Sequence, residues 1–110
     1  MQTAVVINLD YEILSADRGQ KIWRELEKRM LAAGFARDYR VFKMDAPPAV
    51  AFPRARAVLS EFEPFLKQQG LAMFDVVREF YGFEMENCTN LLEPAQSGIE
   101  VQVIEDWLPV

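Results

Sequence analysis

The first ten residues constrain the fold most strongly, because an apolar, mostly β-branched run leads into two polar side chains. The run reads Thr3-Ala4-Val5-Val6-Ile7-Asn8-Leu9-Asp10. It predicts a buried strand over residues 4–9 that emerges at a polar edge of a sheet. Side chains alternate along a strand, so Asn8 and Asp10 should point to the same side. A carboxylate at the end of a central strand can hold a divalent cation or activate water, and it can equally cap a turn.

Length and composition bound the class of protein. A chain of 110 residues with 51% hydrophobic and 26% charged residues is typical of one soluble globular domain. We therefore expect a single domain over residues 1–110. No apolar run approaches the roughly 20 residues of a membrane-spanning helix, and no secretory signal pattern is visible. Cys88 is the only cysteine, which excludes an internal disulfide and fits a reducing compartment, so we expect a cytoplasmic protein.

The absence of histidine limits the chemistry that this chain can perform. Ser-His-Asp and Cys-His catalysis are excluded, and a zinc site is disfavoured. Any reaction would have to use carboxylates, Tyr, Lys, Arg, Ser or Thr.

Charge is unevenly distributed along the chain. Residues 1–78 hold all 12 basic residues and ten acidic ones, a net charge of +2, whereas residues 79–110 hold seven acids and no base, a net charge of −7. The overall charge of −5 argues against broad electrostatic binding of nucleic acid but is compatible with a local basic surface. The basic body and the acidic end could also attract each other between subunits.

A helix is predicted over about residues 18–33. Asp17 and Gln20 have the spacing of a capping box, and Gly34 suits the left-handed position that ends a helix. The apolar stripe of this helix repeats at helical spacing and consists of Ile22, Trp23, Leu26, Met30 and Ala33. We expect this stripe to pack on the sheet, with Phe35 folding back on Met30.

The middle of the chain predicts a strand and a second helix. The strand covers residues 37–44, has apolar side chains on both faces, and ends at two prolines that cannot donate to a sheet. A short strand over residues 49–52 is possible by composition. The second helix should begin near Pro53, be kinked or split at Pro64, and end near Gly70.

Two further strands are expected in the last third of the chain. The first covers residues 76–86, although residues 74–80 also fit a helix. The second covers residues 99–107 and shows Ile99, Val101 and Val103 on one face. An open apolar edge is costly, so we expect this strand to join a partner's sheet and the protein to be a homodimer.

The predicted element order is β-α-β-(β)-α-β-β. It indicates an α+β protein, specifically a ferredoxin-like two-layer sandwich (β-α-β-β-α-β) with an extra C-terminal strand.

Three segments, taken in order, resemble the virulence-associated protein D (VapD) family. Residues 8–14, Asn-Leu-Asp-Tyr-Glu-Ile-Leu, are similar to its Phe-Asp-Leu-Asp opening. Residues 34–42 are similar to its Gly-Phe segment leading to Ser-Val-Tyr or Ser-Val-Phe, and residues 77–87 to its Val-Arg-Asp-Ile-Arg strand. The related small CRISPR adaptation nucleases share the first two features. The resemblance spans about residues 4–94.

The resemblance implies a ferredoxin-like dimer that cleaves RNA or DNA, within a toxin–antitoxin or CRISPR-related system. In such a hydrolase, carboxylates of two subunits hold Mg²⁺ across a cleft and polarise a phosphodiester. Asn8 stands where the family has its first Asp, and Asp10 matches the second. The implied catalytic residues are therefore Asp10 and Asn8, with Asp10 as the metal ligand, and the missing carboxylate implies weak or absent endonuclease activity. Arg40 replaces the serine of the family's second strand.

Other residues are candidates for binding. Arg37, Arg40 and Lys43 could contact nucleic-acid phosphates, or form a solvated strand edge. Glu84 and Glu86 share a strand face and could join Asp10 at a metal.

Aromatic residues offer a further choice. Tyr81, Phe83 and Met85 could stack on bases, with core packing as the alternative. Two functions follow for the whole chain: a VapD-like metal-dependent endonuclease, or a catalytically silent dimeric scaffold or binding module of the same fold.

Overall fold

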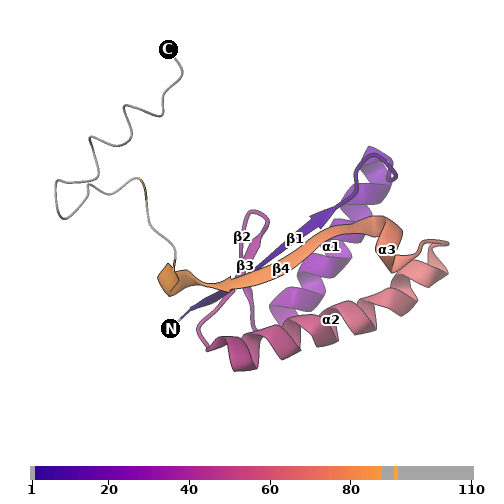
Figure 1. Ribbon diagram of the computed structural model, residues 1–110. Helices are drawn as coiled ribbons and strands as arrows, with labels where there is room; N and C mark the ends of the chain where they lie inside the picture. Colours follow the sequence, from indigo (N-terminus) through magenta and orange to yellow (C-terminus); the bar gives the residue numbers. More distant parts are fainter. Residues whose placement is uncertain (1, 88–90, 92–110) are drawn as a thin grey trace, which may run out of the picture.

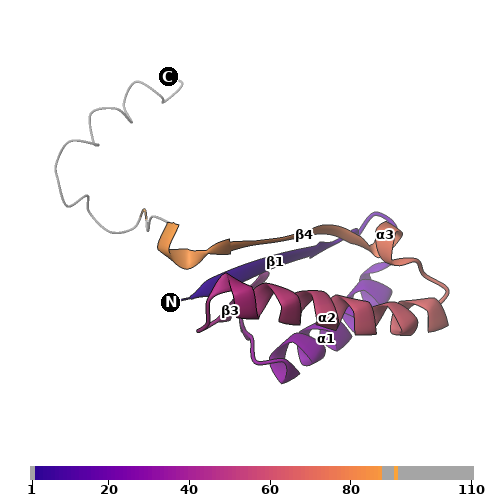
Figure 2. The same ribbon diagram turned by 60° about the horizontal axis from the view of Figure 1, so that its bottom comes forward.

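A four-stranded antiparallel sheet forms one layer of the protein, and two long helices cover one face of that sheet (Figures 1 and 2). The computed structural model describes residues 2–87 and residue 91. In chain order the elements are β1 (Thr3–Leu9), α1 (Ala16–Ala32), β2 (Ala36–Asp38), β3 (Val41–Met44), α2 (Pro48–Gln68), α3 (Met73–Val76), β4 (Val77–Glu84) and the 3₁₀ turn η1 (Met85–Asn87).

The order of strands in the sheet is β2-β3-β1-β4, which makes β1 a central strand as predicted. Val6 in β1 lies opposite Val41 of β3 on one side and Tyr81 of β4 on the other. The predicted α+β class and two-layer sandwich are confirmed. The strand expected over residues 99–107 lies outside the described residues.

The core lies between the sheet and the helices. Val5, Ile7 and Leu9 alternate along β1 and are buried against the helices, because a strand in a two-layer protein presents every second side chain to the covering layer. From α1, the buried residues Leu26 and Met30 meet them, as the stripe predicts. Other core residues come from β3 and α2, namely Phe42, Met44, Ala51, Ala55, Val58, Leu59, Phe62 and Leu66.

The ends of α1 confirm one prediction and correct another. Gly34 has φ +102°, and the backbone N–H of the buried Phe35 donates to the Met30 carbonyl at 3.1 Å, which is the expected glycine-ended helix. At the start, however, Ser15 is the capping residue, and its hydroxyl accepts from the Arg18 N–H at 3.3 Å. The predicted capping box at Asp17 is wrong, because Asp17 lies inside the first turn.

The single strand predicted over residues 37–44 is a β-hairpin instead. β2 and β3 pair antiparallel and are joined at Tyr39 and Arg40, where Tyr39 has a left-handed φ of 57°. Lys43 and Asp38 form an ion pair at 3.1 Å on this hairpin. The expected burial of both faces is wrong, because Phe42 and Met44 of β3 are buried whereas Tyr39 lies in the turn and is 84% exposed.

The second helix begins earlier than predicted and is not interrupted. α2 starts at Pro48, so residues 49–52 are helical and form no strand. Proline lacks an N–H that the first turn of a helix would leave unbonded anyway, so Pro48 suits this position. The helix continues through Pro53 and Pro64. Burial of its apolar stripe offsets the bonds lost at these prolines, each of which costs about 3 kcal/mol in a helix interior.

The ambiguous segment near residue 76 contains both predicted structures. Residues 73–76 form the short helix α3, and the chain then continues as β4 over residues 77–84. No helix within the described residues is long and apolar enough to cross a bilayer.

Candidate nucleic-acid interface

Asn8 is placed by β1 on the sheet face that the helices leave uncovered. Its neighbours Ile7 and Leu9 point into the core, so Asn8 points the other way. The Asn8 Nδ2 donates to Glu79 Oε1 at 2.9 Å, and Arg40 Nη1 donates to Asn8 Oδ1 at 3.4 Å. The neutral amide thus joins the tip of the β2–β3 hairpin to β4.

Asp10 has a different surrounding. Its Oδ1 accepts from the backbone N–H of Glu12 at 2.9 Å, and its own N–H donates to the Val76 carbonyl at 2.8 Å. The carboxylate therefore caps a turn, which was one of the two sequence interpretations. No hydrogen bond joins Asp10 to Asn8 within the described residues, because each side chain has its own partners.

The residues suggested as metal ligands are not gathered around Asp10. Glu84 pairs with Thr3, at the opposite end of β1 from Asp10. Within residues 2–87 and 91, no three acidic or cysteine side chains come close enough to hold one ion. The Asn8 amide is engaged by Arg40 and Glu79, and the Mg²⁺ site that the family resemblance implies between two subunits stays a prediction.

A β-bulge shapes the end of β1. Asn8 pairs with Glu79 and Leu9 with Val77, so Arg78 is the extra residue of β4. Bulges redirect a side chain relative to the regular alternation of a strand. Here the bulge brings the exposed Arg78 to a polar hollow of about 420 Å³.

This polar hollow, called the strand-end hollow below, lies where β1 leaves the sheet. Its lining residues are Asn8, Leu9, Tyr11, Glu12, Arg40, Arg78 and Glu79. Two guanidinium groups and two carboxylates therefore share it. Among the described residues, neither Arg40 nor Arg78 forms an ion pair.

The predicted basic trio is divided by the hairpin. Arg37 faces α1, where its Nε lies 3.1 Å from Glu27 Oε1, and its Nη1 donates to the Tyr39 carbonyl. Lys43 is paired with Asp38. The structure brings Arg37 and Arg40 to one hollow and leaves Lys43 outside it.

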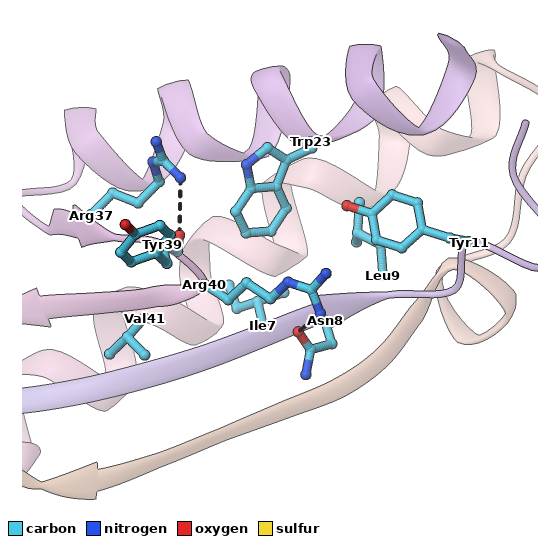
Figure 3. Close-up of a pocket in the computed structure, with 9 residues that line it drawn as sticks. All are labelled: Ile7, Asn8, Leu9, Tyr11, Trp23, Arg37, Tyr39, Arg40 and Val41. Atoms are coloured by element: carbon cyan, nitrogen blue, oxygen red, sulfur yellow. Dashed lines mark hydrogen bonds between the residues drawn. The ribbon is translucent and has the colours of Figure 1, made fainter. Parts of the chain in front are cut away.

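That second hollow is called the aromatic hollow below, and Figure 3 shows the residues that line it. Its volume is about 410 Å³, and it adjoins the strand-end hollow, because Asn8, Leu9, Tyr11 and Arg40 line both. It exists because the hairpin covers β1 only as far as Ile7. The last paired residue of β1 is Val6, and the Ile7 N–H donates to the Arg40 carbonyl at 3.5 Å, so the edge of β1 beyond Ile7 is left uncovered. Three aromatic rings and two arginines line it above an apolar floor. The rings belong to Tyr11, Trp23 and Tyr39, and the arginines are Arg37 and Arg40.

Sequence reasoning missed much of this lining. Trp23 packs on Phe42 of the sheet as predicted, but its half-buried ring also lines the hollow, which the sequence did not indicate. Tyr11 and Tyr39 of this hollow, and Arg78 of the strand-end hollow, were not predicted as site residues. Tyr81 is 51% exposed on the uncovered face of the sheet, opposite Val6, so of its two predicted roles core packing is wrong and base stacking stays a prediction.

Comparisons of the chain with protein-family models, curated proteins and solved structures found no match. The chemistry of the two hollows is therefore the basis for a functional proposal. Guanidinium groups bind phosphate through paired N–H donors, and aromatic rings stack on the faces of bases. Together the hollows suit a ligand that carries both anionic phosphate and flat rings.

Proposed function

We propose that this protein is a nucleic-acid-binding module built on a ferredoxin-like plan similar to that of the VapD family. The observation that carries the proposal is the pair of exposed arginines, Arg40 and Arg78, at the hollow where the central strand ends. A cytoplasmic location, expected from the sequence, fits this role.

The ion pairs around the site explain why Arg40 is the central residue. Arg37 and Lys43 are each neutralised by a carboxylate at 3.1 Å, whereas Arg40 contacts a neutral amide at 3.4 Å. A guanidinium without a carboxylate partner loses no ion pair when it binds phosphate. The family's aspartate would neutralise Arg40, so Asn8 favours binding of an anion over binding of a cation.

Salt dependence tests the proposal. Fluorescence anisotropy of a labelled single strand should show an association constant that falls with salt, with a slope of about −1.4 in log–log form for two phosphate contacts. Binding should be local and modest, because the overall charge of −5 repels the strand at a distance. Absence of binding at low salt would contradict the proposal.

Metal-dependent cleavage at Asp10 is a second candidate function, favoured by the position of this carboxylate immediately beyond the strand-end hollow. We expect any cleavage of RNA or DNA to be weak, to require Mg²⁺ and to be lost in Asp10→Asn. Asparagine can still accept the Glu12 N–H, so this variant removes the charge and keeps the turn. Cleavage by Asp10→Asn at the parent rate, measured on labelled strands with and without chelator, would exclude this function.

The variant Asn8→Asp tests metal binding at this site without measuring cleavage. It places a carboxylate oxygen where Asn8 Nδ2 now lies, 2.9 Å from Glu79 Oε1. The new carboxylate would repel Glu79 and attract Arg40, so the two effects oppose each other without metal. The test is therefore the response to Mg²⁺, which should raise the thermal unfolding temperature of this variant. Asn8→Ala is the control, and Mg²⁺ should leave it unchanged.

We further propose a homodimer in which residues 99–107 of one protomer extend the partner's sheet. β4 lies at the edge of the sheet, and Tyr81 and Phe80 on it are partly exposed. Such an edge strand offers unpaired backbone groups to another strand. Light scattering should give about twice the mass of one chain, and deletion of residues 98–110 should give a monomer or an aggregate. A truncated chain that remains dimeric would contradict this assembly.

A further inference from the structure

The aromatic hollow offers two rings whose positions are fixed by packing. The indole of Trp23 lies against Phe42, with ring centroids 5.8 Å apart and planes tilted by 40°. The Tyr11 ring packs closely on α1 at Gly19, where a Cβ would lie 3.0 Å from two ring carbons. Because Gly19 has no side chain, the Tyr11 ring can lie directly against α1. The same helix carries Trp23, so α1 positions both rings at the hollow. Figure 3 shows them turned toward the same space.

The size and lining of this space fit one flat aromatic group. The volume of about 410 Å³ falls in the range of roughly 300–1,000 Å³ that small-molecule sites occupy. Ile7 and Leu9 supply an apolar floor, and aromatic side chains form the walls. A nucleobase between Trp23 and Tyr11 would displace water and stack on both rings. Stacking on aromatic side chains is the usual way in which proteins bind bases without sequence preference.

The charged side chains around the aromatic hollow indicate which chemical group the flat aromatic ring of the ligand should carry. Arg37 is balanced by Glu27, whereas Arg40 at the rim of the hollow has no ion pair with a carboxylate of residues 2–87. Arg40 also lines the strand-end hollow, as do Asn8, Leu9 and Tyr11. A ligand with a ring in one hollow and a phosphate in the other would meet Arg40 at the junction.

We propose that the aromatic hollow receives one unpaired nucleobase of a bound strand, while Arg40 holds the adjoining phosphate. This inference rests on the proposed function and adds to it a base-binding subsite. A base stacked within a duplex cannot enter, so the subsite selects single-stranded or frayed nucleic acid. A free nucleotide carries the same ring and one phosphate group but lacks the neighbouring phosphate of a strand that Arg78 would contact.

Tryptophan fluorescence tests the subsite directly. The chain has two tryptophans, so Trp107→Phe leaves Trp23 as the only one. We expect a single strand of about 12 nucleotides to quench Trp23 on binding. An abasic strand of equal length should bind more weakly and leave the fluorescence unchanged, and a duplex or a mononucleotide should quench only at much higher concentration.

A matched pair of variants locates the base. Tyr11 and Tyr81 are 47% and 51% exposed, but only Tyr11 lines the aromatic hollow. Tyr11→Leu should weaken binding of the base-containing strand by about tenfold and leave the abasic strand unaffected. Tyr81→Leu should change neither, and circular dichroism should confirm that both variants fold.

The outcomes separate the inference from the proposed function. Binding by anisotropy without quenching of Trp23, with Tyr11→Leu equal to the parent, would overturn the base subsite and leave strand binding standing. A larger effect of Tyr81→Leu would place the bases on the uncovered sheet face and also overturn it. Equal quenching by a mononucleotide would assign the hollow to free nucleotides. No binding of any strand would overturn the proposed function itself.

Discussion

Replacing Phe42 by alanine should lower the free energy of unfolding by about 3–5 kcal/mol. Phe42 lies in β3 with 0% of its surface exposed, and its ring meets Trp23 of α1. The substitution would remove this contact and leave a cavity between the two layers. Since small domains are stable by only about 5–15 kcal/mol, much of the chain should be unfolded at moderate temperature.

Urea denaturation followed by circular dichroism measures this effect. Phe74→Ala is the matched control, because the Phe74 side chain is 94% exposed on α3. Its unfolding free energy should stay within about 0.5 kcal/mol of the parent. Equal midpoints for the two variants would show that β3 and α1 do not share the core described above.

Sequence periodicity predicted the elements that have one clean pattern. The apolar run before Asn8 gave the central strand, and the stripe through Leu26 and Met30, ended by Gly34, gave α1. These predictions succeeded because local propensity and burial favour the same structure.

The wrong secondary-structure predictions have identifiable physical causes. Tyr39 makes a left-handed turn without the glycine or asparagine that usually marks one, so the hairpin read as a single strand. Pro47 and Pro48 read as a loop, although they flank the start of α2. Within α2, tertiary burial overrides the helix-breaking tendency of Pro64, which no local pattern can show.

The candidate site was only partly predictable for a similar reason. Asn8 and Arg40 could be proposed from the sequence, Asn8 because it lies at the polar end of an apolar run and Arg40 because it is basic, like Arg37 and Lys43. The two hollows instead depend on register: β3 stops pairing with β1 at Val6, and the bulge adds Arg78. Register depends on the whole sheet, so the grouping of Tyr11, Trp23 and Arg78 required the fold.

The second large effect concerns strand binding. The double variant Arg40→Glu and Arg78→Glu should weaken binding of a single strand by about a hundredfold, because each charged hydrogen bond to phosphate contributes about 1.5–3 kcal/mol. The carboxylates would also repel the strand. The control is Arg54→Glu and Arg56→Glu, which changes net charge equally on exposed positions of α2.

The most direct test is an anisotropy titration of one labelled strand of about 12 nucleotides against the parent and both double variants at low salt. We predict that reversal of Arg40 and Arg78 nearly abolishes binding, while reversal of Arg54 and Arg56 reduces it by less than about fivefold through long-range charge alone. Equal losses in the two double variants would contradict a phosphate site at the end of β1.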